Sequence, residues 1–277
     1  MTPLPADNHV HSEWSWDAPL ASMIGACARA VELGLPALAF TEHVDHTVWT
    51  VDLGALHGTD HLLRLSGPDG RLTPPAFDAE GYLAAVAECR ERFPGLRILS
   101  GLELGEPHWH AAAIAPVLAA GRFDRVLGSL HCLPDGDGFA EPPGLYGHRD
   151  PQEVVRAYLA EIPRLVGGSD VFAVLAHVDY PLRYWPGEPV EAGAFEEEFR
   201  HALRATARAG RAMEVNTSRP LRPELVRWWR EEGGREVSFG SDAHEPSGLA
   251  RRFGEAADLV EAHGFRPGRH PHDLWTR

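Results

Sequence analysis

The sequence predicts an α/β fold built around a parallel sheet, and two observations support this. Short apolar runs of strand length alternate with longer segments of helical periodicity along the chain. Most of the apolar runs also end in a histidine or a carboxylate, as strands do at the functional face of α/β barrels. No shift in composition marks a boundary within the 277 residues, so we expect a single domain over residues 1–277.

The predicted elements follow one another in a regular βα order. We expect seven strands, at residues 7–11, 35–41, 97–104, 125–129, 171–176, 212–216 and 236–240. Helical periodicity indicates helices at residues 19–34, 78–93, 111–120, 152–166, 195–209, 225–232 and 249–263. Gly34 is a typical stop signal for the first helix.

Two segments interrupt this order, at residues 47–77 and 134–149. Both are rich in Gly and Pro and are too long for plain connections between a strand and a helix. Loops of this kind either cover a substrate or are insertions without function, and the sequence leaves both interpretations open.

The composition excludes several classes of protein. The formal net charge is −14 and all 26 basic residues are arginines, which argues against binding of long nucleic acid because that needs clustered cations. A small anionic substrate remains compatible if local arginines or metal ions reverse the charge at one site. The three cysteines form no CxxC pair, and no apolar run approaches the roughly 18 residues of a membrane span. We therefore expect a protein of the cytoplasm without a membrane partner.

Histidines and carboxylates gather at six of the seven predicted strand ends. They are His9, His11, His43, Glu103, His131, His177, Asp242 and His244. Residues two apart on a strand point the same way, so His9 and His11 reach the same side. The carboxyl ends of the strands of an α/β barrel meet on one face, so we expect all of these side chains to converge.

This set of side chains is typical of a metal site. Imidazole and carboxylate without cysteine suit Zn, Mn, Fe or Co, and the set is too large for one ion, so we expect two or three divalent ions. Closely spaced ions clamp a phosphoryl group and generate hydroxide at neutral pH, so hydrolysis is the predicted reaction. Other mechanisms lack their motifs, because the chain contains no P-loop, no GxGxxG and no GxSxG. Cys132 is disfavoured as a nucleophile because the preceding His131 serves better as a ligand.

Seven segments together resemble the polymerase and histidinol phosphatase (PHP) superfamily. They read DNHVHSEWSWD, FTEHVDH, GLELGE, LGSLHCL, LAHVDYPLR, MEVNTS and FGSDAH. Their order and flanking residues are most similar to the histidinol-phosphate phosphatase branch, and the resemblance extends from about Asp7 to Gly264. It implies a distorted (β/α)7 TIM-like barrel of PHP type that holds a trinuclear metal centre.

The resemblance also distributes nine ligands over three ions. The first ion would be held by His9, His11, Asp242 and a bridging Glu103. The second would be held by Glu103, His131 and His177, and the third by Asp17, His43 and His244. A hydroxide that bridges two ions would attack a small phosphomonoester, and L-histidinol phosphate, which yields L-histidinol and phosphate, is the best single substrate.

Further roles are implied around these ligands. Arg183 matches a position where related phosphatases carry a phosphate-binding arginine, and its planar guanidinium suits that role. Ser129 would be a second donor to phosphate. His46 and Glu106 lie beside ligands in the sequence and either orient them or are solvated neighbours. The proton donor to the leaving group stays open, and the candidates are His108, His110, His148 and Asp179.

The sequence departs from the phosphatase pattern after residues 216–218. Residues 219–223 read RPLRP where that branch carries Tyr-Pro, which puts the identity of the alcohol in doubt.

Two other functions stay open: a PHP phosphodiesterase or exonuclease acting on nucleotides or short oligonucleotides, and a metal-binding module without catalysis. A small phosphorylated metabolite is the partner we expect, and the sequence leaves the oligomeric state open.

Overall fold

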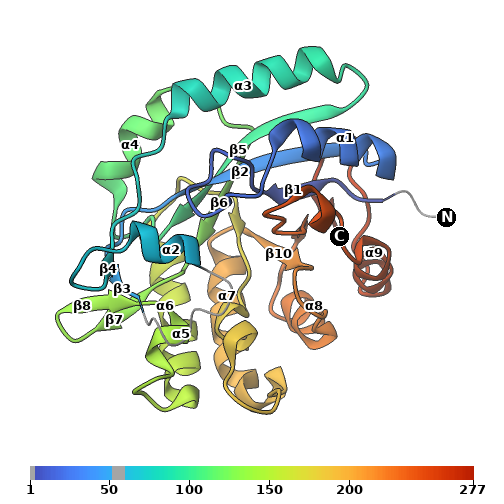
Figure 1. Ribbon diagram of the computed structural model, residues 1–277. Coiled ribbons are helices and arrows are strands. Elements are labelled where there is room, and N and C mark those ends of the chain that lie inside the picture. The colour runs from blue at the N-terminus through green and yellow to red at the C-terminus, as the bar shows by residue number, and fades with distance from the viewer. Residues whose placement is uncertain (1–3, 52–59) are drawn as a thin grey trace.

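The computed structural model describes residues 4–51 and 60–277, and its centre is a curled sheet with helices around its outside (Figure 1). Eight strands form this sheet in the order β1-β2-β5-β6-β9-β10-β11-β12. The first seven pair in parallel and are β1 (Asp7–Val10), β2 (Ala37–Val44), β5 (Arg97–Gly105), β6 (Arg125–Ser129), β9 (Val174–Leu175), β10 (Ala212–Asn216) and β11 (Glu236–Gly240). All seven predicted strands are confirmed, and each pairs with the next predicted strand along the chain.

The sheet curls until its first and seventh parallel strands meet. The peptide N–H of His11 donates to the carbonyl of Ala243 at 2.9 Å, and that of Asp242 donates to the carbonyl of His9 at 2.8 Å. The start of β11 pairs on the same edge with the antiparallel β12 (Trp275–Thr276), and the bridge to β1, between Val10 and Ala243, lies just beyond the end of β11. This partial closure is the distorted (β/α)7 barrel that the sequence predicts.

The helices also match the predicted ones, with ends that shift by at most four residues. They are α1 (Met23–Leu33), α3 (Ala79–Arg92), α4 (Ala111–Ala119), α6 (Pro151–Gly168), α7 (Glu196–Arg208), α8 (Pro223–Glu231) and α9 (Phe253–Ala262). Gly34 ends α1 with a φ of 68°, a left-handed conformation that glycine adopts without strain. Asp78 and Asp150 begin α3 and α6 as N-caps, because their side chains accept the free N–H groups of the first turn.

The two Gly- and Pro-rich segments contain short elements of their own. The first holds β3 (Trp49–Thr50), α2 (Asp60–Leu65) and β4 (Arg71–Leu72), and the second follows β7 (Leu133–Asp135) into β8 (Gly138–Ala140) and α5 (Pro142–Leu145). β3 pairs with β4 and β7 pairs with β8, both antiparallel, and β3 and β8 lie side by side (Figure 1). Part of the first segment, residues 52–59, lies outside the described residues.

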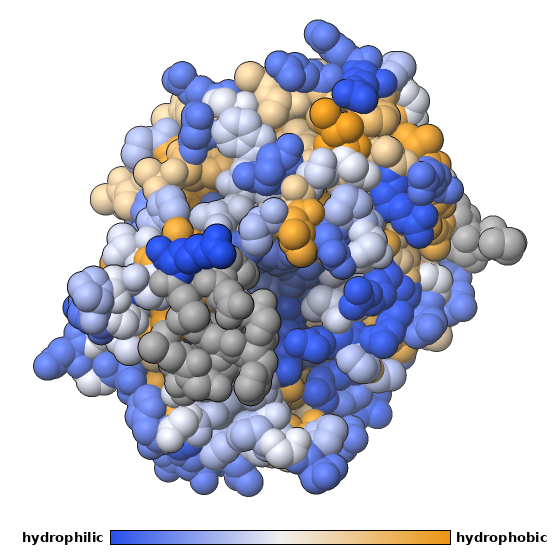
Figure 2. Space-filling model, in the orientation of Figure 1, coloured by the Kyte–Doolittle hydropathy of each residue, from blue (hydrophilic) through white to orange (hydrophobic). Residues whose placement is uncertain are grey.

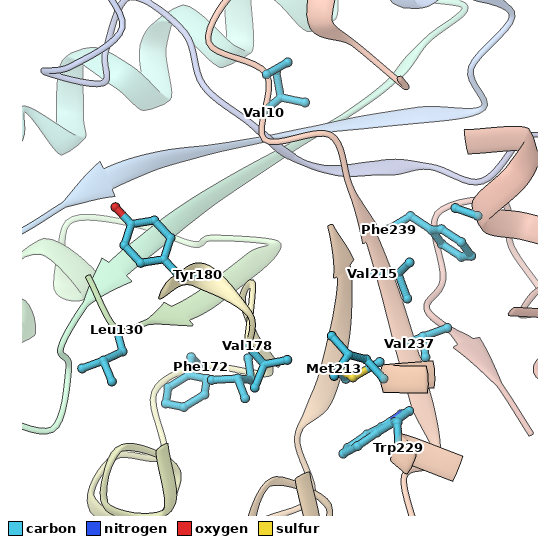
Figure 3. Close-up of a cluster of buried hydrophobic side chains, with 14 of the residues drawn as sticks. Val10, Leu130, Phe172, Val178, Tyr180, Met213, Val215, Trp229, Val237 and Phe239 are labelled. Carbon is cyan, nitrogen blue, oxygen red and sulfur yellow. The ribbon is translucent and has the colours of Figure 1, made fainter. Parts of the chain in front are cut away.

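The main hydrophobic core lies between the sheet and its helices. Met213 of β10 and Val237 and Phe239 of β11 gather there with Trp229 of α8 (Figure 3). These side chains are buried to 98% or more, which fixes the strands and therefore the positions of the residues at their ends. Among the residues described, no helix combines the length and the apolar composition that crossing a bilayer requires.

Candidate metal centre

The predicted strand-end residues converge at the carboxyl ends of the parallel strands. Glu103 lies in β5, while His9 and His43 lie in β1 and β2. The remaining predicted ligands follow strands in short loops and are His11, Asp17, His131, His177, Asp242 and His244. The structure therefore brings all nine predicted ligand residues into one cluster.

Glu103 lies at the centre of the cluster, with its side chain 1% exposed. Its Oε2 lies 3.1 Å from His9 Nε2 and 3.4 Å from both His11 Nε2 and His43 Nδ1. In the described part of the chain this oxygen accepts no hydrogen bond of regular geometry, although histidine nitrogens surround it. A buried carboxylate oxygen in this position is typical of an atom that binds a cation.

The other oxygen of Glu103 contacts a second pair of histidines. Glu103 Oε1 lies 2.9 Å from His177 Nε2 and 3.2 Å from His131 Nε2, and it accepts a hydrogen bond of 2.5 Å from the hydroxyl of Ser129. The two oxygens thus face different histidines, as they do in a carboxylate that bridges two sites. Ser129 has only one hydroxyl proton, so in this arrangement Glu103 rather than a phosphate receives it.

Two carboxylates complete the cluster on its outer side. Asp17 Oδ2 lies 3.2 Å from His244 Nε2 and 3.4 Å from His43 Nε2. Asp242 Oδ1 lies 3.4 Å from His11 Nε2 and 3.6 Å from His9 Nε2.

Four overlapping groups in this cluster have ligand atoms close enough to share an ion. They are His9–His11–Glu103, His9–His177–Asp242, His43–Glu103–His131 and His11–His43–His244. They overlap with the three implied sets without reproducing them, since none of the four contains Asp17. The cluster can therefore hold divalent metal.

The chemistry of the histidines fits such an ion. His9 Nδ1 lies 2.6 Å from Glu214 Oε1, so Nδ1 carries the proton and the lone pair of Nε2 faces Glu103 and Asp242. In the absence of a metal ion, a second proton on the His9 imidazole balances the charge of the surrounding carboxylates. Burial opposes the protonation of His9, but Glu103, Glu214 and Asp242 outweigh it and hold the pKa of His9 well above its usual value.

His11 differs from His9, and so does His177, whose pKa burial also lowers. Burial, with the neighbouring His244 and His43, lowers the pKa of His11 to about 3. Its imidazole is therefore neutral at physiological pH, which is the form that binds metal.

Several carboxylates that the sequence does not predict surround the ligands. Asp45 lies between two histidines, with Oδ2 3.2 Å from His43 Nδ1 and Oδ1 3.4 Å from His131 Nδ1. Glu214 accepts the backbone N–H of His177 at 2.7 Å as well as contacting His9. The signal that could have revealed Glu214 is a charged residue inside an otherwise apolar strand, AMEVN, and the same holds for Glu42 in ALAFTEHV.

Glu106 takes the orienting role expected for it. Its buried carboxylate accepts the backbone N–H groups of His131 at 2.6 Å and Cys132 at 2.9 Å, and also the hydroxyl of Thr47 at 2.5 Å. Its φ of 45° places it in the left-handed region, a strained backbone that these contacts hold in place. His46, the other expected orienter, packs beside His110 with ring centroids 5.9 Å apart.

A cavity of about 330 Å³ opens over the cluster. Aromatic side chains line it, namely Trp16, Trp49, Tyr180 and Tyr184, together with three carboxylates outside the predicted ligand set, Asp45, Glu106 and Glu141. Figure 2 shows this face of the molecule, where a hollow with a mostly hydrophilic visible lining lies near the centre of the view. Both Gly- and Pro-rich segments contribute to the lining, through Thr47, Thr50 and Pro143 among others, which favours a role at the site over an insertion without function.

Arg183 lies in this cavity, in the short 3-10 helix η1 (Tyr180–Tyr184) that follows His177. Its Nη1 donates to Asp242 Oδ2 at 2.8 Å, and its guanidinium lies over the ring of Tyr180, 5.6 Å from the centroid. Its Nε is buried and contacts no hydrogen-bond acceptor among the described residues. Arg183 is thus fixed beside the cluster with a donor group still unused.

The four residues expected as proton donors lie elsewhere. His108 pairs with Glu161, His148 with Asp135, and Asp179 with Arg222, while His110 contacts the hydroxyl of Thr47. Within the described part of the chain none of the four lines the cavity. Cys132 does line it, but burial raises the pKa of its thiol well above the usual value, so the thiol is a poor nucleophile.

The fold and the cluster define a (β/α) barrel protein with a histidine- and carboxylate-lined metal site at the ends of its strands. The family model of the PHP domain matches residues 7–218. The chain belongs to the PHP domain family, as its sequence motifs predict.

Curated relatives and a solved structure resemble the chain over most of its length. A protein of Deinococcus radiodurans described as "Probable histidinol-phosphatase" is 28% identical over 274 residues, which cover 94% of each chain. A Clostridium acetobutylicum protein of the same description is 24% identical over 69% of this chain and 76% of its own. The crystal structure of histidinol phosphate phosphatase from Lactococcus lactis subsp. lactis Il1403, complexed with Zn, L-histidinol and phosphate, has a TM-score of 0.76, 21% identity and 99% coverage of both chains. This likeness confirms the fold.

Proposed function

We propose that the protein is a metal-dependent phosphomonoesterase whose substrate is L-histidinol phosphate. The observation that carries this proposal is the arrangement of Glu103, which five histidines surround at the base of a cavity that Arg183 also lines. The descriptions of the curated relatives support the same activity.

The proposed ligand sets follow the resemblance, and the contacts in the cluster support them. The first is His9, His11, Glu103 and Asp242, the second is Glu103, His131 and His177, and the third is Asp17, His43 and His244. Within each set, contacts of 2.9–3.6 Å join a carboxylate oxygen to histidine nitrogens. The identity of the ions, Zn, Mn or Fe, stays open because imidazole and carboxylate accept each of them.

Divalent ions in these sets would supply a hydroxide nucleophile at neutral pH and neutralise the charge of the phosphate. Arg183 has the geometry to donate to a phosphate oxygen and to hold the phosphoryl group in one orientation. Asp242, its present partner, keeps the guanidinium beside the cluster. The chain thus contributes ligands, a positioned cation and a cavity above them.

The rest of the cavity fits a positively charged alcohol. Asp45, Glu106 and Glu141 line it, and none of the three forms an ion pair with an arginine among the described residues. Burial raises the pKa of Glu141 to about 7, so a bound cation would stabilise its ionised form. L-Histidinol carries an ammonium group and an imidazole, and the aromatic walls of the cavity suit both. This supports histidinol phosphate over a neutral ester.

Purified protein loaded with Zn or Mn tests the proposal on a panel of phosphate esters, with elemental analysis of the same preparation. We expect phosphate release from L-histidinol phosphate with the highest kcat/KM of the panel. Phosphate release from other monoesters alone would reject L-histidinol phosphate as the substrate and would still support a phosphomonoesterase. Degradation of an end-labelled oligonucleotide in place of monoesters would establish a phosphodiesterase, and metal binding without any turnover would establish a non-catalytic module.

The remaining expectations about the protein stay predictions. They are a single domain, a location in the cytoplasm and a small phosphorylated metabolite as the partner.

A further inference from the structure

One serine hydroxyl lies between a buried carboxylate and two of the proposed metal ligands. Ser15 Oγ lies 2.6 Å from Glu42 Oε2, 2.8 Å from His11 Nδ1 and 3.1 Å from the backbone N of His43. Ser15 is 4% exposed, Glu42 is fully buried and His11 is 1% exposed. These atoms are shielded from bulk solvent, and buried polar groups of this kind are satisfied by the partners that the protein places around them.

The direction of each hydrogen bond follows from counting protons. A serine hydroxyl has one proton to donate and two lone pairs that accept. The backbone N–H of His43 can only donate, so it occupies one lone pair of Ser15. Burial raises the pKa of Glu42, but the backbone N–H of Ser12 at 3.0 Å and the Ser12 hydroxyl at 2.6 Å both donate to it and favour its ionised form, to which we assign the role of acceptor. The one proton of Ser15 therefore goes to Glu42.

What remains on Ser15 is a single lone pair, and it faces His11. An Nδ1 atom without a proton would bring two lone pairs together at 2.8 Å, so Nδ1 must carry the proton. Because a neutral imidazole has one proton on its nitrogens, Nε2 is then left with a free lone pair. That lone pair faces His9 Nε2 at 3.1 Å, so in the metal-free protein a proton on His9 Nε2 satisfies it, and it lies 3.4 Å from both Glu103 Oε2 and Asp242 Oδ1, the other proposed ligands of the first ion.

We propose that Ser15 is a positioning residue that, anchored by Glu42, fixes His11 in the Nδ1–H tautomer and so directs its Nε2 toward metal. Ser15 also holds the backbone of His43, so one hydroxyl sets the position of ligands from the first and the third proposed sets. The inference rests on the proposed function in one respect only, the role of His11 as a metal ligand.

The chain offers a matched pair of variants for the test. Ser15→Ala and Ser12→Ala each remove one hydroxyl that donates to the same carboxylate, but only Ser15 contacts a histidine ring. Ser15→Thr keeps the hydroxyl and serves as the rescue variant. Metal affinity is measured by competition with a chromophoric chelator for Zn. The tautomer of His11 is read from the ¹⁵N shifts of its ring in metal-free protein at neutral pH, assigned by the loss of its signals in His11→Asn.

We expect His11 to be in the Nδ1–H tautomer in the unmodified protein and to become a mixture of tautomers in Ser15→Ala. Zn affinity should fall about 10- to 100-fold in Ser15→Ala, the range known for partners that orient metal ligands, and should recover in Ser15→Thr. Ser12→Ala should keep the tautomer and stay within about threefold of the unmodified affinity, because the histidine contact is intact.

An Nε2–H tautomer of His11 in the unmodified protein would overturn the inference, whether or not the variants fold. Equal losses of affinity in Ser15→Ala and Ser12→Ala would also overturn it, because they would trace the effect to Glu42 alone. Failure of the proposed function is a different result. A protein that binds Zn without hydrolysing any ester would refute the phosphatase while leaving the tautomer and affinity results in force.

Discussion

Two charged clusters in the molecule are built in opposite ways. On the surface, between α7 and α8, Arg200 contacts Glu196 at 2.7 Å, Glu231 at 2.6 Å and Glu232 at 3.0 Å, while Arg204 contacts Glu232 at 2.7 Å. Each carboxylate there faces a cation that is charged at every physiological pH. In the buried cluster around Glu103 the carboxylates face histidines instead, and one oxygen of Glu103 accepts no hydrogen bond of regular geometry among the described residues.

The difference shows that only the buried cluster is organised for binding. The surface cluster is complete by itself, and pairs of this kind contribute little because water screens them. The buried cluster is incomplete without an added cation, and burying so many ionisable groups costs free energy of folding. Such a cost is typical of sites kept for binding or catalysis. Variants in the two clusters should therefore change different properties of the protein.

Glu103→Gln should have the largest effect on activity. It removes the charge that both halves of the cluster share, so kcat/KM for phosphate release should fall by about 10³-fold, the upper end of the range for removing one preorganised electrostatic group from a catalytic centre. Arg200→Ala, the matched change in the surface cluster, should leave kcat/KM unchanged. Steady-state kinetics of both metal-loaded variants decide this, and similar activities would remove the contrast between the clusters.

Arg183→Met should lower kcat/KM by about 100-fold, because a charge-assisted donor to phosphate is lost while the length of the side chain is kept. Elemental analysis should show unchanged metal content, which separates a role on the phosphate from the contact of Arg183 with Asp242. Arg222→Met is the control, since Arg222 pairs with Asp179 and does not line the described cavity. Loss of metal together with activity would assign Arg183 to the support of Asp242 instead.

Removing the metal should lower stability and leave the surface cluster untouched. At a free metal concentration of about 100 times Kd, binding adds about 2.7 kcal/mol to the free energy of unfolding, and a chelator removes it. Denaturant unfolding of the metal-loaded and chelated protein measures the change. Added salt should act on the surface cluster in both forms, because it screens exposed charges. An unfolding curve that a chelator does not move would contradict metal binding at this cluster.

Glu141→Gln should discriminate between substrates. Losing an ionised partner costs about 1.5 kcal/mol or more, so KM for L-histidinol phosphate should rise about tenfold or more. The KM for p-nitrophenyl phosphate, which carries no positive charge, should stay the same. Equal changes for both esters would show that Glu141 does not recognise the alcohol.

Arg200→Ala should give the smallest effect, a loss of about 1 kcal/mol of unfolding free energy. The pH dependence of this loss in unfolding free energy follows from Glu232. Burial alone would raise the pKa of Glu232, but hydrogen bonds from Arg204 and Arg200 outweigh it and hold the pKa below the usual 4.5. A lowered carboxyl pKa stabilises the fold above the unfolded value, and this contribution disappears as the pH falls through the folded value. The difference between variant and unmodified protein should therefore vanish in acid unfolding series, and a constant difference would exclude Glu232 as its source.

The residues that the sequence predicted well are those whose pattern is local. Gly34 as a helix stop and the HxH spacing of His9 and His11 depend on geometry that repeats within one element. The proton donors were not predictable in this way. His108 and Asp179 follow strand ends as the ligands do, but their side chains turn to Glu161 and Arg222, and only packing decides this.

By itself the sequence determined the order of strands and helices, the family and the residues that meet at the strand ends, because strand periodicity and chain order fix where side chains emerge. Only the tertiary structure decided that Glu103 lies among five histidines and that Asp242 holds Arg183. It also decided that Ser15 contacts both His11 and Glu42. These contacts join residues from different strands and loops, and curling of the sheet, which buries apolar side chains beneath its helices, sets the distances between them.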